Sequence, residues 1–517
     1  MNLRRLVCLA AVLLAVGWAS VAVTGGQELT LSSQVVERTL PNGLKVLMVK
    51  RTAAPVVRCI LAYRVGSVNE RPGITGISHF HEHMMFKGTY SMGIKPGTLE
   101  KDLEFDRRID ALMAQVAEEE AKVRGRDEAK LIAWKKQVSE LLAQQKHETI
   151  ASEEIWAAYQ EAGGTGINAS TGNEMTQYYV TLPKNTLELY LALEADRLAN
   201  PVFREFYSER DVITEERRMS ENQPGYFFQE QLNATFYGAS PYGWGVIGWM
   251  SDVSRVTKQE MIDYREQFYR PDNATLVLVG DLDPDQVMPL VTKYFGPLAS
   301  KGKSPRVRTE EPSPEYYRRT VGPNFKPPHI EKRVYGRAAT QPTLAVMFHI
   351  PPVWHDDLAP LYMLGRAMSA RTGRMHQEMV NAKDPHASAV MANASTSMYD
   401  GSFSFRVTAR ELRNEVVVPM DQLEKELWAY IEDARATPVD GDLLQRVKNS
   451  IEAQYLQSLA GTGIAGTLAR METAYRWQFL EEQHKQRMAV TPDDLLRVAK
   501  KYFTRDNCVT GVLEREK

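Results

Sequence analysis

The sequence predicts an α+β protein made of two related units in tandem. At 517 residues the chain exceeds the size of one hydrophobic core, so at least two domains are expected. Residues 256–273 realign without a gap on residues 490–507, with an offset of 234 at both ends (490 − 256 and 507 − 273). Each copy has the pattern of a Thr-capped amphipathic helix, an Asp-Asn turn and a β-branched strand.

A proline-rich segment separates the two copies. Residues 301–328 contain six prolines, few apolar side chains and charges of both signs, a composition typical of an extended linker. We therefore expect a first unit at 27–300, a linker at 301–329 and a second unit at 330–517.

The N-terminus has the composition of an export signal. A pair of arginines precedes an apolar run over residues 6–16, and small residues follow as far as Ala22. These features predict a signal peptide over residues 1–26, hence an exported protein, in the periplasm if the cell is Gram-negative, with no stable membrane span after signal removal. The apolar stretch is just long enough to cross a bilayer, so an uncleaved membrane anchor is the alternative.

Charge and cysteine content exclude other classes of protein. A net charge of −2 provides no basic field for nucleic acid, so no nucleic-acid partner is expected. After signal removal the cysteines are Cys59 and Cys508, which lie in opposite units on strand-like segments. We expect two buried free thiols rather than a disulfide.

The first unit begins with strand patterns. Residues 43–49 alternate apolar and polar side chains, and residues 56–65 are rich in β-branched residues. The tetrapeptide Asn-Ala-Ser-Thr occurs at 168–171 and again at 393–396, which adds a short match between the units.

The pentapeptide His79-Phe80-His81-Glu82-His83 has the spacing of a zinc site on a helix. Positions i and i+4 lie on one helix face about 5–6 Å apart, so His79 and His83 can bind one ion. Glu82 points to the same side, whereas His81 points away and is expected to pack or to lie on the surface. The order H-x-x-E-H is that of the inverted zincins, although it arises by chance in about one chain of this size in a hundred.

Residues 99–146 predict a helical hairpin without a counterpart in the second unit. The segment is rich in Glu, Lys, Ala and Leu and is interrupted at residues 124–126. Apolar side chains recur every three or four residues, as in a coiled-coil seam. They are Ile109, Leu112, Val116, Val123, Leu131, Trp134, Val138 and Leu141. We place an insertion at about 97–162, which acts either as a solvated spacer or as an arm that docks a partner.

A second acidic helix offers a third zinc ligand. Catalytic zinc usually keeps three protein ligands and an open position for water. The helical pattern over residues 208–219 contains Glu209 and Glu216, seven residues apart and therefore on one face. Spacing alone leaves a ligand helix and a solvated acidic face equally open.

These motifs resemble those of the pitrilysin/insulinase family of zinc peptidases, and most closely its bacterial members that are similar to mitochondrial processing peptidase. The family motif is G-x-x-H-x-x-E-H-M-x-F-x-G-T, and residues 76–89 match it at every fixed position. The family's distal helix carries a glutamate followed seven residues later by a zinc-binding glutamate, the places of Glu209 and Glu216. Other similar segments are Asn168-Ala-Ser-Thr171, Pro241-Tyr242-Gly243, Ile247-Gly248-Trp249 and Tyr269-Arg-Pro-Asp-Asn-Ala-Thr275.

The resemblance implies a fold and a set of catalytic groups. Each unit is expected to be an α/β sandwich, a mostly antiparallel sheet covered by helices. One zinc ion is expected on His79, His83 and Glu216. Glu82 is then the catalytic base, which accepts a proton from water and passes it to the leaving amine. Glu209 is expected beside the ligands, where it orients one of them or tunes its charge.

The resemblance also implies how peptides bind. In the family the substrate adds as a strand to a sheet edge, and the matching strand here is residues 166–182, with Asn168 and Ala169 at its start. Active members need an arginine and a tyrosine from another half. Val380 stands at the position of the arginine, and Ala387 or Ser388 at that of the tyrosine. We therefore expect a hetero- or homodimer with a related subunit that supplies both groups.

A second departure is the distance between ligands in the sequence. His83 and Glu216 are 133 residues apart (216 − 83), which is longer than usual in the family, and the helical insertion accounts for the excess. The expected function is a zinc endopeptidase that hydrolyses peptides or small unfolded proteins in the cell envelope. The alternatives are a catalytically silent assembly or peptide-binding subunit and a nonhydrolytic zinc-dependent binder of exported peptides. Silent members tend to lose part of the zinc set, which is complete here.

Overall fold

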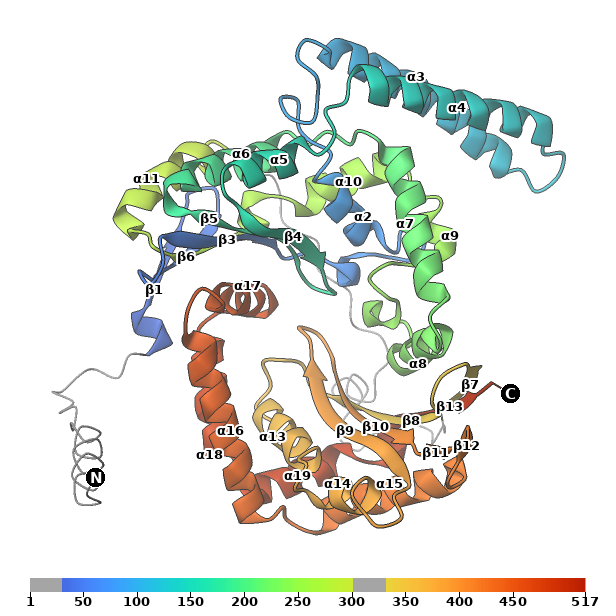
Figure 1. The fold of residues 1–517 in the computed structure, drawn as a ribbon, viewed down its shortest axis with the longest axis vertical. Helices are drawn as coiled ribbons and strands as arrows, with labels where there is room; N and C mark the ends of the chain where they lie inside the picture. The colour runs from blue at the N-terminus through green and yellow to red at the C-terminus, as the bar shows by residue number, and fades with distance from the viewer. Residues whose placement is uncertain (1–29, 301–331, 517) are drawn as a thin grey trace, which may run out of the picture.

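Two sheets, each with its own layer of helices, form the part of the protein that the computed structural model describes, residues 30–300 and 332–516 (Figure 1). The first sheet has the order β1-β2-β6-β3-β5-β4 and the second the order β7-β13-β8-β10-β9. Neighbouring strands are antiparallel except in the pairs β2–β6 and β7–β13. The predicted α+β fold of two tandem units is thus confirmed. The expected signal peptide and linker lie outside the described residues.

The first unit surrounds its sheet with helices from several parts of the chain. Its strands are β1 (Val35–Thr39), β2 (Lys45–Lys50), β3 (Val56–Tyr63), β4 (Thr165–Thr171), β5 (Thr176–Pro183) and β6 (Ala274–Gly280). Its helices are α2 (Ile77–Met84), α3 (Leu99–Glu120), α4 (Glu128–Glu148), α5 (Glu154–Glu161), α6 (Leu187–Ala199), α7 (Phe206–Glu221), α8 (Tyr226–Tyr237), α9 (Met250–Val253), α10 (Lys258–Phe268) and α11 (Pro284–Phe295).

The second unit repeats this plan with fewer elements. Its strands are β7 (Lys332–Ala338), β8 (Thr343–Ile350), β9 (Ala387–Thr396), β10 (Gly401–Ala409) and β13 (Cys508–Arg515), with a small hairpin of β11 (Glu411–Leu412) and β12 (Glu415–Val416). Its helices are α13 (Leu358–Met368), α14 (Arg374–Met379), α15 (Met420–Ala436), α16 (Gly441–Leu459), α17 (Ile464–Ala474), α18 (Phe479–Ala489) and α19 (Pro492–Tyr502).

The repeated sequence segment forms the same structure in both units. Thr257 and Thr491 close capping boxes at the starts of α10 and α19, so each threonine satisfies backbone N–H groups of its helix. Each helix is followed by a 3-10 turn and then by β6 or β13, which hold equivalent places next to the parallel strand of their sheets. The two Asn-Ala-Ser-Thr segments end β4 and β9, each of which is one of the two edge strands of its sheet.

Each unit covers one face of the other unit's sheet with a helix (Figure 1). Helix α17 packs on β3 and β6 of the first sheet, where Ile464 and Leu468 are fully buried. Helix α8 packs on β7 and β13 of the second sheet, where Leu232 is fully buried. We call these two contacts the reciprocal helix exchange. It joins the units through their apolar cores, and Arg64 and Lys45 add hydrogen bonds to Glu472.

Helices α3 and α4 form a hairpin that projects from the first unit (Figure 1). Phe105, Ile109, Val138 and Leu141 form its buried seam. The assignment of Val123 to this seam was wrong: the residue lies in the turn between the helices and is 97% exposed. The following helix, α5, belongs to the main core of the first unit instead.

At its base, the hairpin is held by a buried ion pair. The guanidinium of Arg204 donates to Asp102 at 2.7 Å and to the carbonyl oxygens of Thr89 and Met92 at 2.7 and 3.1 Å. Both charged side chains are fully buried. Arg204 comes just before α7, so it ties the hairpin, the loop after α2 and the start of α7 together.

Two further predictions, the strand at 166–182 and the two buried thiols, differ in part from the structure. The single strand expected at 166–182 is wrong, because β4 and β5 are two strands joined by a turn over 172–175. Cys59 and Cys508 are free thiols as expected, but Cys508, the first residue of β13, is only half-buried. Within the described ranges no helix combines the length and apolar character needed to cross a bilayer.

Candidate metal centre

Helix α2 presents two histidines because its start and its apolar face are fixed by the core. The buried carboxylate of Glu70 accepts hydrogen bonds from the N–H groups of Gly76 and Ser78 at 2.8 and 2.9 Å, which caps the helix. Burial raises the pKa of Glu70 to about 7. Gly76 has a φ of 88°, and a Cβ there would lie 2.4 Å from the carbonyl oxygen of Ile247. Phe80 faces the core, fully buried.

His79, His83 and Glu216 converge from α2 and α7. Oε2 of Glu216 lies 3.9 Å from Nε2 of His79 and 3.8 Å from Nε2 of His83. One ligand atom from each residue falls within 4.8 Å of the others, and no second such group of three occurs among the described residues.

This donor set fits a zinc ion. Tetrahedral zinc with Zn–N and Zn–O bonds near 2.0–2.2 Å places its ligand atoms about 3.3–3.6 Å apart. The two distances from Glu216 to the histidines, 3.8 and 3.9 Å, exceed this by a few tenths of an ångström. Burial, together with the neighbouring His83, lowers the pKa of His79 to about 4, which keeps this imidazole neutral and able to coordinate. Three ligands leave the fourth position open, the usual arrangement of a catalytic site.

The other nitrogen of His83 is held by Glu209. Nδ1 of His83 and Oε1 of Glu209 are 2.9 Å apart, and Lys87 donates to Oε2 of the same carboxylate at 2.5 Å. Burial raises the pKa of Glu209, but the bonds from His83 and Lys87 outweigh burial and leave that pKa below its usual value. Conversely, burial lowers the pKa of His83, and the bond to Glu209 with the nearby carboxylates outweighs it.

Glu82 lies next to this group without belonging to it. Its Oε2 accepts a hydrogen bond of 2.5 Å from the hydroxyl of Thr171, at the end of β4. Burial raises the pKa of Glu82, and the Thr171 bond only partly opposes that effect. The raised pKa makes this carboxylate a stronger proton acceptor than an ordinary glutamate.

Asn168 and Ala169 lie on β4, three and two residues before Thr171. The strand is the edge of the first sheet and pairs only with β5 among the described strands. Helix α2 contacts β4, so this edge borders the metal centre. The side chain of Asn168 accepts a bond from the N–H of Ala169 at 2.8 Å.

His81 takes no part in the centre. It is fully buried, and its ring stacks on Tyr269 with centroids 3.8 Å apart. This packing agrees with the prediction that His81 points away from the metal side of the helix. Lys87 and Thr171 are the two polar partners of the centre that sequence reasoning missed. Lys87 is four residues after His83, just beyond the end of α2, whereas Thr171 carries no signal in the sequence except its place in the Asn-Ala-Ser-Thr segment.

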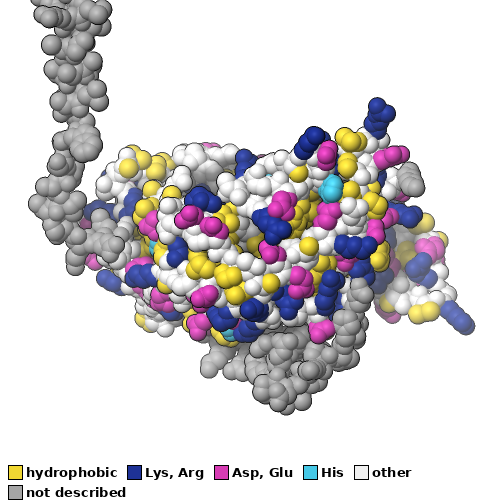
Figure 2. Space-filling view, turned by 90° about the horizontal axis from the view of Figure 1, so that it is seen from below, with side chains coloured by type: hydrophobic (Ala, Val, Ile, Leu, Met, Phe, Trp, Pro, Cys, Tyr) yellow, Lys and Arg dark blue, Asp and Glu magenta, His cyan; other side chains and the backbone are white. Residues whose placement is uncertain are grey.

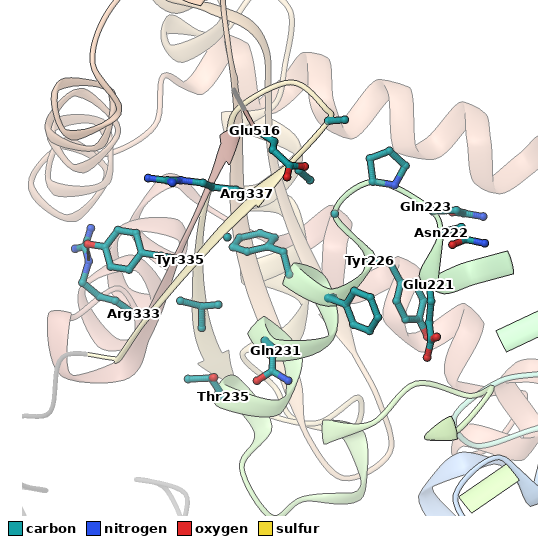
Figure 3. Close-up of a pocket in the computed structure, with 18 residues that line it drawn as sticks. Glu221, Asn222, Gln223, Tyr226, Gln231, Thr235, Arg333, Tyr335, Arg337 and Glu516 are labelled. Atoms are coloured by element: carbon teal, nitrogen blue, oxygen red, sulfur yellow. Dashed lines mark hydrogen bonds between the residues drawn. The ribbon is translucent and has the colours of Figure 1, made fainter. Parts of the chain in front are cut away.

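A cavity lies away from this centre. It has a volume of about 690 Å³ and lies between the end of α7, the start of α8 and the edge strand β7 (Figure 3). Tyr226, Arg333 and Tyr335 line it, and no histidine does. The face of the second unit seen in Figure 2 carries acidic and basic side chains interspersed, without a field of one sign.

Sequence models of two domains from one peptidase family match the chain. The model described as insulinase (peptidase family M16) matches residues 45–94 and 138–248, and the peptidase M16 inactive domain matches residues 255–451. Helix α3 and the first half of α4 fall in the interval that the first model leaves unmatched.

Similar proteins have comparable lengths. The zinc protease PqqE of Helicobacter pylori is 24% identical over 524 residues, which is 99% of each chain. A probable mitochondrial-processing peptidase subunit beta of Schizosaccharomyces pombe is 23% identical over 488 residues, or 92% of this chain and 90% of that one. The crystal structure of a protease from Helicobacter pylori has a TM-score of 0.72 at 22% identity over 93% of this chain and 99% of its own, which shows a shared fold.

Proposed function

Since this chain belongs to the insulinase family of peptidases, family M16, we propose that it is a zinc-dependent endopeptidase in which His79, His83 and Glu216 hold the metal. The observation that carries the proposal is the approach of these three side chains to one another beside the carboxylate of Glu82. No other group of potential ligands competes with them in the described part of the chain.

The residues around the centre have separate roles in the proposed peptide hydrolysis. A zinc ion held there supplies a Lewis acid that acidifies water and polarises a peptide carbonyl. Glu82 accepts the proton of the attacking water at its carboxylate and delivers it to the departing amine. Its raised pKa favours retention of the proton between the two transfers. Glu209 holds Nδ1 of His83, which directs the other nitrogen of that ring toward Glu216.

The edge strand β4 is the proposed binding place of the peptide. Its unpaired side can add one more strand through main-chain hydrogen bonds, which bind extended peptides of varied sequence. Asn168 and Ala169 are the proposed contacts, and Thr171 at the end of the strand connects this edge directly to Glu82.

Thr171→Val is expected to lower kcat roughly three- to tenfold, because it removes one hydrogen bond of about 0.5–1.5 kcal/mol that orients the base. Thr171→Ser keeps the hydroxyl and should retain most of the activity. The measurement is steady-state hydrolysis of a quenched peptide by both variants, with the zinc dissociation constant as control. A Val variant with wild-type kcat would show that Glu82 needs no such orientation.

The proposed enzyme is exported and works with a related subunit. Val380, Ala387 and Ser388, at the end of α14 and the start of β9, cannot supply the guanidinium and phenol that active members of the family use. A hetero- or homodimer partner would bring both. Co-purification from the native envelope, followed by mass spectrometry, identifies that chain and checks the location.

Removal of the metal tests the function itself. The protein, purified with its co-purifying chains, should cleave a quenched peptide library, lose this activity in a chelator and regain it with about one equivalent of Zn²⁺. Zinc binding without any cleavage would replace the proposal with a nonhydrolytic peptide binder. Absence of both would leave a catalytically silent assembly subunit.

A further inference from the structure

A single carboxylate connects Lys87 to the metal centre. Glu209 uses one oxygen for Nδ1 of His83, at 2.9 Å, and the other for Nζ of Lys87, at 2.5 Å. The three side chains are between 11% and 23% exposed, so solvent screens these contacts only in part. Lys87 occupies a position that the family motif leaves free, between Phe86 and Gly88.

The geometry points to Lys87 as a positioning residue of the zinc site, which acts on His83 through Glu209. This inference rests on the proposed function of the same site. An ionised carboxylate only accepts hydrogen bonds, so Glu209 requires the hydrogen of His83 on Nδ1 and leaves the lone pair on Nε2, the atom that faces Glu216. The ammonium of Lys87 holds the second oxygen, which fixes the rotation of the carboxylate and favours its charged form.

The two histidines differ in how much support they receive. Nδ1 of His79 is buried and has no hydrogen-bond partner among the described residues. The orientation of the pair toward Glu216 therefore depends more on His83, and the contacts of Glu209 with His83 and Lys87 are the polar restraint on that ring. Loss of Lys87 removes one of the two contacts that hold the carboxylate of Glu209.

A second lysine provides a matched control. Lys87 lies 3.9 Å from Glu205, the residue before α7, and Lys146 of α4 lies 3.8 Å from the other oxygen of that same residue. Both lysines thus reach the start of α7, but only Lys87 also binds Glu209. A general loss of positive charge at this end of the helix would affect the two variants alike.

The test measures zinc affinity by competition with a chromophoric chelator, independently of turnover. Lys87→Met is expected to weaken zinc binding about tenfold, within the range for groups that support a metal ligand. Lys87→Arg keeps a cationic donor and should stay much closer to wild type, and Lys146→Met should not differ from it. Lys87→Gln replaces Lys87→Met if thermal unfolding shows the latter to be misfolded.

A double-mutant cycle decides whether Lys87 acts through Glu209. If it does, Lys87→Met combined with Glu209→Gln binds zinc no more weakly than Glu209→Gln alone. Additive losses, or an unchanged affinity of Lys87→Met and Lys87→Gln, overturn the inference. Failure of the wild-type protein to bind zinc is a different result, because it overturns the proposed function instead.

Discussion

Glu82→Gln is expected to reduce peptide hydrolysis by about a thousandfold, near the middle of the range for loss of a general acid–base group. The amide has nearly the same size and can still accept the hydroxyl hydrogen of Thr171, but it cannot take a proton from water. Zinc binding should remain within about twofold, since Glu82 is not part of the ligand group. The measurement compares kcat/KM and zinc affinity of the two proteins with the co-purifying partner present.

Glu140→Gln is the matched control for this variant. Glu140 lies on α4 with its side chain 60% exposed, so the same chemical change there should leave both quantities unaltered. Equal hydrolysis by wild type and Glu82→Gln would falsify the assignment of Glu82 as the base, even if zinc is bound as expected.

Arg204→Met is expected to destabilise the first unit by about 3–5 kcal/mol, the usual loss when one member of a buried ion pair is removed. The change leaves Asp102 buried without its counter-charge and frees the carbonyl oxygens of Thr89 and Met92. Because Arg204 also fixes the start of α7, the separation of Glu216 from the two histidines should become less well defined. Denaturant unfolding and zinc affinity measure these two effects.

Lys101, the residue before Asp102, provides the control for this prediction. Lys101 pairs with Glu148 on the surface of the hairpin with its side chain 57% exposed, and Lys101→Met should cost less than about 1 kcal/mol. Asp102→Asn in the Arg204→Met background should recover part of the loss, because the unpaired charge is then absent. If Arg204→Met itself lowers the free energy of unfolding by less than about 1 kcal/mol, the prediction is wrong, because water or rearrangement then stabilises the unpaired carboxylate.

Local patterns in the sequence predicted much of the fold. The repeated Thr-capped helix and its β-branched strand occur in both units as expected, since capping and periodicity depend on neighbouring residues. The division of residues 166–182 into β4 and β5 was missed, although Gly172 and Asn173 are residue types typical of turns. The apolar face of α17 indicates that this helix packs against another element. It does not indicate that this element is the sheet of the other unit.

The candidate site was predictable to different degrees. His79 and His83 follow from helical spacing alone, because both ligands lie on one short helix. The role of Glu216 could be predicted only from the resemblance to a family, because the intervening chain is long and no pattern in it determines where α7 packs. Lys87 and Thr171 depend on three-dimensional contacts with Glu209 and Glu82, which no spacing rule describes.

The reciprocal helix exchange also bears on how this architecture arose. An ancestral chain with a single unit would have left exposed the sheet face that α17 or α8 covers here, and another copy of itself could cover that face with the equivalent helix. Such an arrangement is a symmetric dimer with one self-complementary interface. Gene fusion would then have made the pairing permanent and released each half to diverge. One half could keep the proposed metal ligands while the other lost them, because the apolar contacts between the units, and not the chemistry, require both halves.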